Sequence, residues 1–425
     1  MSGAAPAPGS PLEAWLDYIG RQHPSAIDLG LDRPRAVLGR LAPTRPPVVI
    51  TVGGTNGKGS TTAMLESILR AAGYRTGLYT SPHLVRYAER VRLDGEEASE
   101  ADLVAGFEAI ERARGDTSLT YFEYGTLAAF EIFARRQVEV AILEVGLGGR
   151  LDCVNLLDAD ASIVVSVDLD HQDWLGPTRE AIGFEKAHIF RAGRPAIYGE
   201  ADMPRSVAGH AAAIGADLQV AGRDFRFVRH EGQWDFEGRR GAKRALPMPA
   251  LRGPWQLGNA SAALATLDEL SDRLPVSLGE IKRGLTGVRL AGRLQVLPGR
   301  PSVVLDVAHN PHAARALAQG LGGMGYARET IAVFAMLGDK DIEGVVAAMA
   351  DRVDRWHVAS VASERAAPVE RLAQALASRG AGERIRRFAT VPLAYEAALR
   401  EAGPDDRILV FGSFLTVADV LRLPR

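Results

Sequence analysis

Residues 50–62 read Ile-Thr-Val-Gly-Gly-Thr-Asn-Gly-Lys-Gly-Ser-Thr-Thr. The run at 48–52 follows two prolines and is apolar and rich in β-branched residues, which is typical of a central parallel strand. Apolar residues then recur at helical spacing between Met64 and Ala72, and Gly73 stands where a helix ends. The stretch therefore predicts a glycine-rich turn that joins a buried strand to a helix.

The residues of this turn point to a nucleotide triphosphate. It contains four glycines: Gly53, Gly54, Gly57 and Gly59. Glycines permit backbone conformations in which successive N–H groups converge on phosphate oxygens, and the helix N-terminus adds further N–H groups. Lys58 supplies a mobile positive charge, and the hydroxyls of Ser60 and Thr61 are candidate magnesium ligands, although Gly59 separates them from the lysine that they usually follow. Tight packing alone would also explain the glycines, but the lysine and hydroxyls favour ATP binding.

Composition limits the class of protein. A chain of 425 residues with 47% hydrophobic residues predicts two or three domains of a well-buried α/β protein. The 50 basic residues balance 52 acidic ones, so no global field favours nucleic acid or an anionic membrane. The single cysteine, Cys153, excludes an internal disulfide and fits a reducing compartment. Residues 1–11 lack the features of a signal peptide, and no apolar run approaches membrane-spanning length. We therefore expect a soluble, cytoplasmic monomer.

The pattern predicts two α/β blocks with a boundary near residue 296. In the first block, strands are expected at 48–52, 76–80, 138–145 and 161–167, and helices at 259–270 and 278–286. Between them, aromatic residues alternate with polar ones at 221–249, which predicts a β-hairpin around Glu231 and Gly232. Residues 287–301 contain glycines, prolines and arginines and are the expected linker.

Strands and helices alternate again from residue 301 onward. Strands are expected at 302–307, 331–336, 356–361 and 407–411, and helices at 312–321, 341–353, 368–378 and 391–401. The predicted fold is therefore a phosphate-loop domain with a parallel sheet (residues 1–295), followed by a smaller, doubly wound, Rossmann-like domain (residues 296–425).

Two acidic segments follow expected strands of the first block. Glu144 closes the apolar run 141–143, and at the carboxyl end of a parallel strand it would face the phosphate loop. Magnesium usually takes one or two carboxylates together with phosphate and water, so Glu144 fits the role of a ligand. The alternative is that Glu144 only caps the end of the strand at the protein surface. Residues 168–176, Asp-Leu-Asp-His-Gln-Asp-Trp-Leu-Gly, are either a second cation site or an ordinary acidic turn.

Two further segments carry side chains suited to ligand contacts. Ser81 follows the expected strand at 76–80 and either binds metal or phosphate or caps a helix before Pro82. Residues 120–124, Thr-Tyr-Phe-Glu-Tyr, place aromatic rings beside one carboxylate, which suits a flat heteroaromatic substrate. Core packing is the alternative for Tyr121 and Phe122.

With these motifs in place, the chain resembles the dihydrofolate synthase/folylpolyglutamate synthase family, which belongs with the Mur ligases to a larger group of ATP-dependent amide ligases. The resemblance runs from Asp28 to Thr416. It is carried by the order and spacing of motifs at residues 54–60, 81–84, 119–125, 143–152, 170–176, 185–187, 306–311 and 339–341.

The resemblance implies a role for each matching residue. The expected ATP contacts are Gly57, Lys58, Gly59, Ser60, Asn259, Arg293 and Asp306. The expected ligands of Mg²⁺, with two ions in the site, are Ser81, Glu144 and His171. Lys186 is expected to be N6-carboxylated and to act in catalysis with Lys58, Glu144 and His171. The pterin end of the substrate is expected to contact Asp28, Leu29, Gly30, Leu31, Thr120, Tyr121, Phe122, Glu123, Leu151, Asp152 and Cys153.

The implied reaction joins L-glutamate to a carboxylate. ATP would first phosphorylate the carboxylate, which is a poor electrophile, and the amino group of glutamate would then displace phosphate. Dihydropteroate and reduced folates are the implied acceptors. Two departures from the family pattern, Trp255 in place of a more usual His and Cys153 in place of a small residue, concern fine substrate contacts.

Three alternatives differ in the reaction or the acceptor. A monofunctional folylpolyglutamate synthase would share the ATP and metal motifs. A Mur-type peptide ligase carries a nucleotide-sugar domain ahead of the phosphate loop, and fewer than 55 residues precede Gly53 here. A nucleotide switch or motor would explain the loop but gives no use for Ser81 or for the aromatic segment 120–123.

Overall fold

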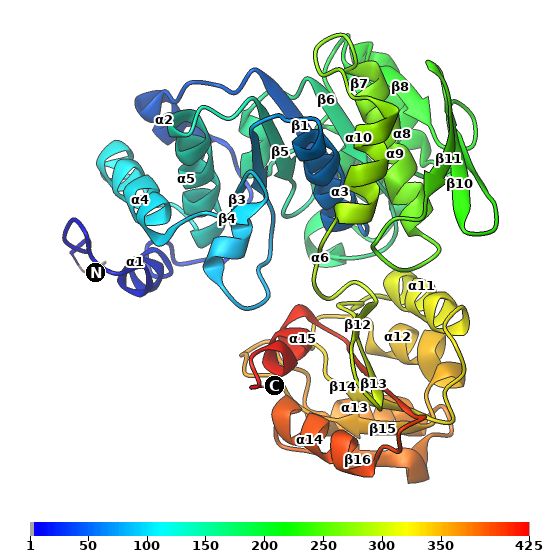
Figure 1. Cartoon of the computed structure of the whole chain (residues 1–425). Coiled ribbons are helices and arrows are strands. Elements are labelled where there is room, and N and C mark those ends of the chain that lie inside the picture. Colours follow the sequence, from blue (N-terminus) through cyan, green and yellow to red (C-terminus); the bar gives the residue numbers. More distant parts are fainter. Residues whose placement is uncertain (1–3, 425) are drawn as a thin grey trace. The chain divides into compact units, whose positions relative to one another are not determined.

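The computed structural model describes residues 4–424. Contacts divide the chain into two compact units, and each is described by itself (Figure 1). The N-terminal unit comprises the described residues up to 167 together with 175–248 and 258–288. The C-terminal unit comprises 168–174, 249–257 and the described residues from 289 onward. The main change between units therefore falls at Val288 and Arg289, inside the segment expected to be a linker, and the assignment of a function to each unit stays a prediction.

The N-terminal unit is built on an eight-stranded sheet in the order β4-β3-β2-β5-β1-β6-β7-β8. The strands are β1 (Val48–Gly53), β2 (Thr76–Tyr79), β3 (Val91–Leu93), β4 (Glu96–Glu97), β5 (Val140–Glu144), β6 (Ala161–Val164), β7 (Pro195–Tyr198) and β8 (Asp217–Val220). The six strands from β2 to β8 along this order pair in parallel, and β3 and β4 extend one edge in antiparallel pairing. All residues of β1 and β5 are buried, as the continuous apolar runs predict for strands covered on both faces.

Helices cover this sheet. They are α1 (Leu12–Ile19), α2 (Asp32–Leu41), α3 (Lys58–Ala71), α4 (Glu100–Arg114), α5 (Tyr121–Arg135), α7 (Arg179–Ala187), α8 (Arg205–Ile214), α9 (Gln256–Glu269) and α10 (Leu278–Gly287). Helix α3 packs on β1, β2 and β5 and contacts α10 along its length. One core joins Val49 and Leu143 of the sheet to Trp15, Phe107 and Phe130 of the helices. The burial of these large side chains fixes the strand ends that carry the expected site.

The insertion at 221–249 is a separate sheet of three strands, in the order β11-β10-β9. Strands β9 (Arg226–Arg229) and β10 (Gln233–Gly238) form the expected hairpin, with Glu231 and Gly232 in its turn. A third strand, β11 (Gly241–Pro247), was not predicted. Its residues are mainly exposed and apolar residues do not alternate with polar ones along it, so it lacks the pattern on which strand prediction depends.

The C-terminal unit is a six-stranded sheet in the order β12-β13-β17-β14-β15-β16. The strands are β12 (Gln295–Leu297), β13 (Ser302–Leu305), β14 (Thr330–Phe334), β15 (Arg355–Val358), β16 (Ile385–Arg387) and β17 (Arg407–Phe411). All pairs are parallel except β12 with β13. The helices are α6 (Gln172–Leu175), which extends one residue beyond this unit, α11 (Pro311–Gly322), α12 (Ile342–Met349), α13 (Val369–Ala377), α14 (Val391–Glu401) and α15 (Phe414–Leu421).

The predicted fold class is confirmed: a parallel sheet with a phosphate loop is followed by a smaller Rossmann-like α/β unit. The segment 287–301, expected to be the linker, contains the change between the units but is not a linker throughout, because Val296 and Leu297 lie in β12 and pair with Val304 and Val303 of β13. Within residues 4–424, no helix has the length and hydrophobicity needed to cross a membrane.

Candidate active site

The phosphate-loop sequence lies at the carboxyl end of β1, the strand between β5 and β6. Gly54 has φ +144° and Gly57 has φ +84°, conformations that residues with a Cβ rarely adopt. A Cβ on Gly57 would lie 2.6 Å from Oδ1 of Asn259 and 2.7 Å from Cγ1 of Val165. Only glycine therefore fits between the loop, the segment after β6 and helix α9.

Hydrogen bonds to the backbone and the side chain of Ser166 hold the loop against the segment after β6. The N–H of Thr55 donates to the carbonyl of Ser166 over 2.9 Å. The N–H of Asn56 donates to Oγ of Ser166 over 2.9 Å, and that hydroxyl donates back to the carbonyl of Asn56 over 3.0 Å. Ser166 was not predicted as a partner of the loop, because it lies inside the strand expected at 161–167, whereas β6 ends at Val164. These contacts fix the loop in the conformation that a phosphate cradle requires.

Two lysines converge on one carbonyl of the loop. Nζ of Lys58, the first residue of α3, donates to the carbonyl of Gly54 over 3.0 Å. Nζ of Lys186, which is buried near the end of α7, donates to the same carbonyl over 3.1 Å. Positive charge is thus gathered beside the N-terminus of α3, where an anion is favoured. The structure places Lys186 beside the phosphate loop, 132 residues distant in sequence.

Hydroxyl groups line the first turn of α3. Ser60 and Thr61 are both fully buried, as is Gly59 beside them. The Thr61 hydroxyl donates to the carbonyl of Gly57 over 3.0 Å, so it closes the first turn of the helix. Its lone pairs stay available as acceptors, and the assignment of either hydroxyl to magnesium stays a prediction.

Glu144 and Ser81 lie at the same edge of the sheet as the loop. Glu144 ends β5, is 5% exposed and pairs in register with Val52 of β1. Tyr79, the last residue of β2, pairs with Leu143, so the chain reaches Ser81 just beyond the neighbouring strand end. Ser81 does not cap a helix, because the next helical turn begins at Tyr87. The parallel register therefore brings a carboxylate and a hydroxyl to the edge where the phosphate loop lies.

His171 belongs to the C-terminal unit, where it lies beside Asp170 and Lys340. Nζ of Lys340 is 2.6 Å from Oδ1 of Asp170 and 3.4 Å from Nε2 of His171. Asn310 donates to Asp170 over 3.0 Å, and Nε2 of His309 is 3.5 Å away from it. Burial opposes ionisation of Asp170, but the hydrogen bond from His309 and the nearby positive charges outweigh it and lower the pKa of this carboxyl. Asp170 is therefore held by several partners, and the choice between a second cation site and an ordinary acidic turn stays open. Because Glu144 and His171 lie in different units, their grouping around one metal stays a prediction.

Arg293 and Asp306 lie together in the C-terminal unit. Asp306 follows β13, is 6% exposed and accepts hydrogen bonds of 2.8 Å from the N–H groups of Leu294 and Ala308. Burial raises the pKa of Asp306 despite these bonds. The Arg293 guanidinium lies 5.2 Å from the centre of the Phe414 ring. Asn259, the third expected ATP contact outside the loop, is buried in α9 beside Gly57 in the N-terminal unit.

The three segments expected to hold the pterin meet in the N-terminal unit. Thr120 caps α5 and exchanges hydrogen bonds with Glu123, whose carbonyl lies 4.0 Å from Sγ of Cys153. Arg33 links Glu123 to Asp28, so the segment 28–31 is joined to the other two. Arg33 was not predicted in this role, and no pattern around it in the sequence indicates the role. The remaining expected members of these segments are Leu29, Gly30, Leu31, Tyr121, Phe122, Leu151 and Asp152.

Asp152 is a buried carboxyl among backbone donors. Its Oδ2 accepts from the N–H of Leu147 over 2.8 Å and its Oδ1 from the N–H of Val154 over 2.9 Å. Burial raises the pKa of Asp152 to about 6, although the backbone hydrogen bonds and the charge of Lys58 oppose that rise. The carboxyl therefore changes its charge close to neutral pH, next to the phosphate loop.

The aromatic rings of Phe122 and Tyr121 pack against different neighbours. A Cβ on Gly146 would lie 2.7 Å from the Phe122 ring, so that ring covers the glycine that follows β5. Tyr121 meets Tyr87 edge to face at 5.7 Å, with the Arg90 guanidinium 5.4 Å from its ring centre. Trp255, one of the two departures, packs against the core of the C-terminal unit.

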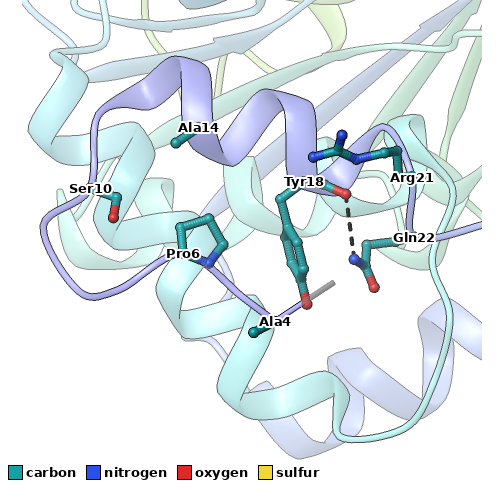
Figure 2. Close-up of a pocket in the computed structure, with 7 residues that line it drawn as sticks. All are labelled: Ala4, Pro6, Ser10, Ala14, Tyr18, Arg21 and Gln22. Atoms are coloured by element: carbon teal, nitrogen blue, oxygen red, sulfur yellow. Dashed lines mark hydrogen bonds between the residues drawn. The ribbon is translucent and has the colours of Figure 1, made fainter. Parts of the chain in front are cut away.

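A cavity of about 530 Å³ lies at the N-terminal end of the described chain (Figure 2). It is lined by Ala4, Pro6, Ser10, Ala14, Tyr18, Arg21 and Gln22. None of the residues expected in the active site lines it, so it is separate from the phosphate loop and from the three substrate segments.

Comparison with known proteins agrees with this geometry. The Mur ligase middle domain matches residues 52–218, and the glutamate ligase domain of Mur ligases matches residues 292–414. The dihydrofolate synthase/folylpolyglutamate synthase of Escherichia coli K12 is 47% identical over 98% of this chain and 96% of its own length. The chain belongs to the dihydrofolate synthase/folylpolyglutamate synthase family. It is accordingly an ATP-dependent ligase.

Solved structures of the family superpose closely on this chain. The Escherichia coli FolC structure in complex with DHPP and ADP has a TM-score of 0.93 and 46% identity, with 98% of both chains covered. A bifunctional folylpolyglutamate synthase/dihydrofolate synthase with Mn, AMPPNP and L-glutamate bound has a TM-score of 0.91 and 45% identity, covering 98% of this chain and 99% of that one. The predicted family is therefore confirmed.

Proposed function

We propose that this chain joins L-glutamate to dihydropteroate and to the glutamyl tail of reduced folates, with ATP as the second substrate. The observation that carries the proposal is the convergence of Lys58 and Lys186 on the Gly54 carbonyl, at the edge of the sheet where Glu144 and the phosphate loop lie. Family membership supplies the reaction class, and the bound DHPP, ADP and glutamate of the related structures support the choice of substrates.

The loop fits the phosphates of ATP. Gly54 and Gly57 leave space that a Cβ would fill, and the first turn of α3 presents N–H groups to the same region. Gly57, Lys58, Gly59 and Ser60 would bind the phosphates, with Asn259 at the side of the loop. Arg293 and Asp306, which belong to the C-terminal unit, would supply further contacts to the nucleotide.

A divalent metal fits the donors at the sheet edge. In residues 4–424 no three His, Cys, Asp or Glu side chains form a metal-binding group. Mg²⁺ does not need such a group, because it typically combines one or two carboxylates with phosphate and water. Ser81, Glu144 and His171 would hold two Mg²⁺ ions together with the nucleotide. When bound, the metal offsets the negative charge of the phosphoryl oxygens.

Lys186 would be N6-carboxylated in the active enzyme. An ammonium beside Mg²⁺ is electrostatically unfavourable, whereas carboxylation makes the end of the side chain negative. The carbamate keeps one N–H on Nζ, so the hydrogen bond to the Gly54 carbonyl is compatible with the modification. Labelled bicarbonate should give a carbonyl resonance that is absent in Lys186→Ala. A bare ammonium in a nucleotide-bound, metal-loaded crystal grown with bicarbonate would contradict the modification.

The residues of the chain then have distinct tasks in the reaction. Lys58 and the loop N–H groups stabilise the charge on the γ-phosphoryl group as it moves from ATP to the acceptor carboxylate. The α-amino group of glutamate attacks the resulting acyl phosphate, the new amide bond forms as the C–O bond to phosphate breaks, and a proton leaves the amine. The three segments around Glu123 hold the pterin while this occurs. The reaction needs only small-molecule substrates, and a cytoplasmic monomer would carry it out.

Incorporation of labelled L-glutamate tests the proposal. Purified protein is supplied with ATP, Mg²⁺ and glutamate, and with dihydropteroate or tetrahydrofolate in separate reactions. The proposal expects product with both acceptors and no ATP hydrolysis when the acceptor is left out. Product from tetrahydrofolate alone would indicate a monofunctional folylpolyglutamate synthase, and hydrolysis without any acceptor would indicate a nucleotide switch.

A further inference from the structure

Arg33 bridges two of the three substrate segments. It is the second residue of α2, and only Asp32 separates it from the segment 28–31. Its Nη1 lies 2.8 Å from Oδ2 of Asp28, and its Nη2 donates to Oε1 of Glu123 over 3.0 Å. One guanidinium thus holds two carboxylates that are far apart in sequence.

The carboxylate of Glu123 depends on this contact. The Glu123 side chain is only 4% exposed, and its other oxygen accepts the N–H of Thr120 over 2.8 Å. A buried carboxylate that loses its cationic partner is strongly disfavoured, so the Glu123 side chain would move if Arg33 were removed. The main chain of Glu123 also contacts Cys153, so such a movement would reach the third segment.

The carboxylate of Asp28 has a second partner that does not replace Arg33. Nε2 of His23 lies 3.3 Å from Oδ2 of Asp28, which holds that side chain within its own loop. Only Arg33 connects Asp28 to α5 among the contacts described above. A guanidinium presents several N–H groups in a fixed planar fork, whereas a lysine ammonium is a single point charge. The bridge therefore requires arginine.

We infer that Arg33 is a positioning residue that sets the geometry of the dihydropteroate site without acting in phosphoryl transfer. The inference rests on the proposed function and deepens it. Dihydropteroate reacts at its aminobenzoate carboxylate, whereas a reduced folate reacts at the end of a glutamyl tail and needs its pterin in another position. Loss of Arg33 therefore weakens use of dihydropteroate more than use of tetrahydrofolate, and leaves the KM for ATP unchanged.

The test compares Arg33→Leu and Arg33→Lys with Arg40→Leu. Arg40 is a matched control on the same helix, where it donates to the carbonyls of Ala113 and Arg114 and to Thr117, outside the three segments. Both Arg33 variants are expected to raise the KM for dihydropteroate and its dissociation constant about tenfold or more, with little change in kcat. The increase for tetrahydrofolate is smaller, Arg33→Lys does not restore the wild-type value, and Arg40→Leu leaves all these values unchanged.

Several results would overturn the inference. One is an unchanged KM for dihydropteroate in either folded Arg33 variant. Another is an equal increase of KM for dihydropteroate and for tetrahydrofolate. A third is an increase in Arg40→Leu as large as that in the Arg33 variants. If Arg33→Leu does not fold, Arg33→Lys retains the positive charge and decides the question. Failure of the proposed function is visible separately, because the wild-type protein would then make no product from dihydropteroate and would not bind it.

Discussion

The phosphate loop and the three segments expected to hold the pterin are built in opposite ways. The loop is one continuous stretch whose shape is imposed by Gly54 and Gly57 and by neighbouring backbone. The pterin segments come from three distant parts of the chain and are held together by ion pairs and a helix cap around Glu123. A site of the first kind has a backbone with little conformational freedom, which suits a phosphoryl transfer that is common to all acceptors. A site of the second kind can change its geometry and suits the choice between acceptors.

The largest expected effect is that of Lys58→Ala. Loss of one charge contact to the transferring phosphoryl group typically lowers the rate about a hundredfold or more. The variant should fold, because Lys58 is only partly buried and its side chain donates to carbonyls of the loop itself. Turnover and thermal unfolding are measured beside Lys282→Ala, a control lysine in α10. Near-wild-type turnover in folded Lys58→Ala would contradict a role of the phosphate loop in catalysis.

Substitutions of two glycines compare the regions directly. Gly57→Ala places a Cβ against Asn259 and Val165 at φ +84°, so we expect a loss of about 1–3 kcal/mol in the free energy of unfolding. Displacement of the loop should also lower kcat/KM for ATP by up to about a hundredfold. At Gly30 a Cβ meets no atom within 4 Å, so Gly30→Ala should leave the unfolding temperature unchanged and affect only dihydropteroate binding. Equal destabilisation by both substitutions would contradict the proposed contrast.

Removal of the carboxylate at the sheet edge should change the metal requirement. Glu144→Gln is expected to raise the half-saturating Mg²⁺ concentration about tenfold or more, because a charged oxygen ligand is lost. The matched control is Glu139→Gln, just before the opposite end of β5, where the side chain is 42% exposed. Identical Mg²⁺ titrations for the wild-type protein and Glu144→Gln would show that the cation is held by other residues.

The pH dependence of dihydropteroate binding should report on Asp152. Because its pKa is raised to about 6, the carboxyl is neutral below that pH and can then accept fewer hydrogen bonds from the N–H groups of a pterin. The KM for dihydropteroate should therefore increase several-fold as the pH falls through about 6, and this increase should be absent in Asp152→Asn.

Protein stability should change in the opposite direction over the same pH range. A carboxyl whose pKa rises on folding stabilises the folded state below its unfolded value of 3.8, and that contribution is lost as the pH rises through about 6. Thermal unfolding across this range should show the change in the wild-type protein and not in Asp152→Asn. If the KM for dihydropteroate depends on pH in the same way in the wild-type protein and in Asp152→Asn, a group other than Asp152 causes that dependence.

How well the sequence predicted each region depends on the same difference between one continuous stretch and segments that are distant in the chain. The phosphate loop, its strand and its helix were predictable because glycine, lysine and apolar periodicity occur within one short stretch. Strands β12 and β16 were missed because they have three residues each and are not fully buried. Arg33 could not be predicted as a bridge, because Glu123 lies 90 residues away and only the folded α2 and α5 bring the two together.

The prediction for His171 shows a similar limit. A position just after an expected strand indicated a place at the end of the first sheet, but the segment 168–174 packs with the C-terminal unit and His171 lies beside Lys340. Near a domain boundary, the residues that a side chain contacts depend on where the chain passes from one unit to the other. Local periodicity in the sequence does not encode those positions. The motif 339–341 was recognised, yet its pattern alone gave no role for Lys340.

The central claim is that one phosphate loop serves both acceptors while the distributed segments choose between them. The most direct test is the ratio of kcat/KM for dihydropteroate to kcat/KM for tetrahydrofolate, measured in Gly57→Ala and in Asp28→Ala. The account predicts that Gly57→Ala lowers both values by the same factor and leaves the ratio unchanged, whereas Asp28→Ala lowers the ratio about tenfold. A ratio that changes equally in both variants would contradict the claim.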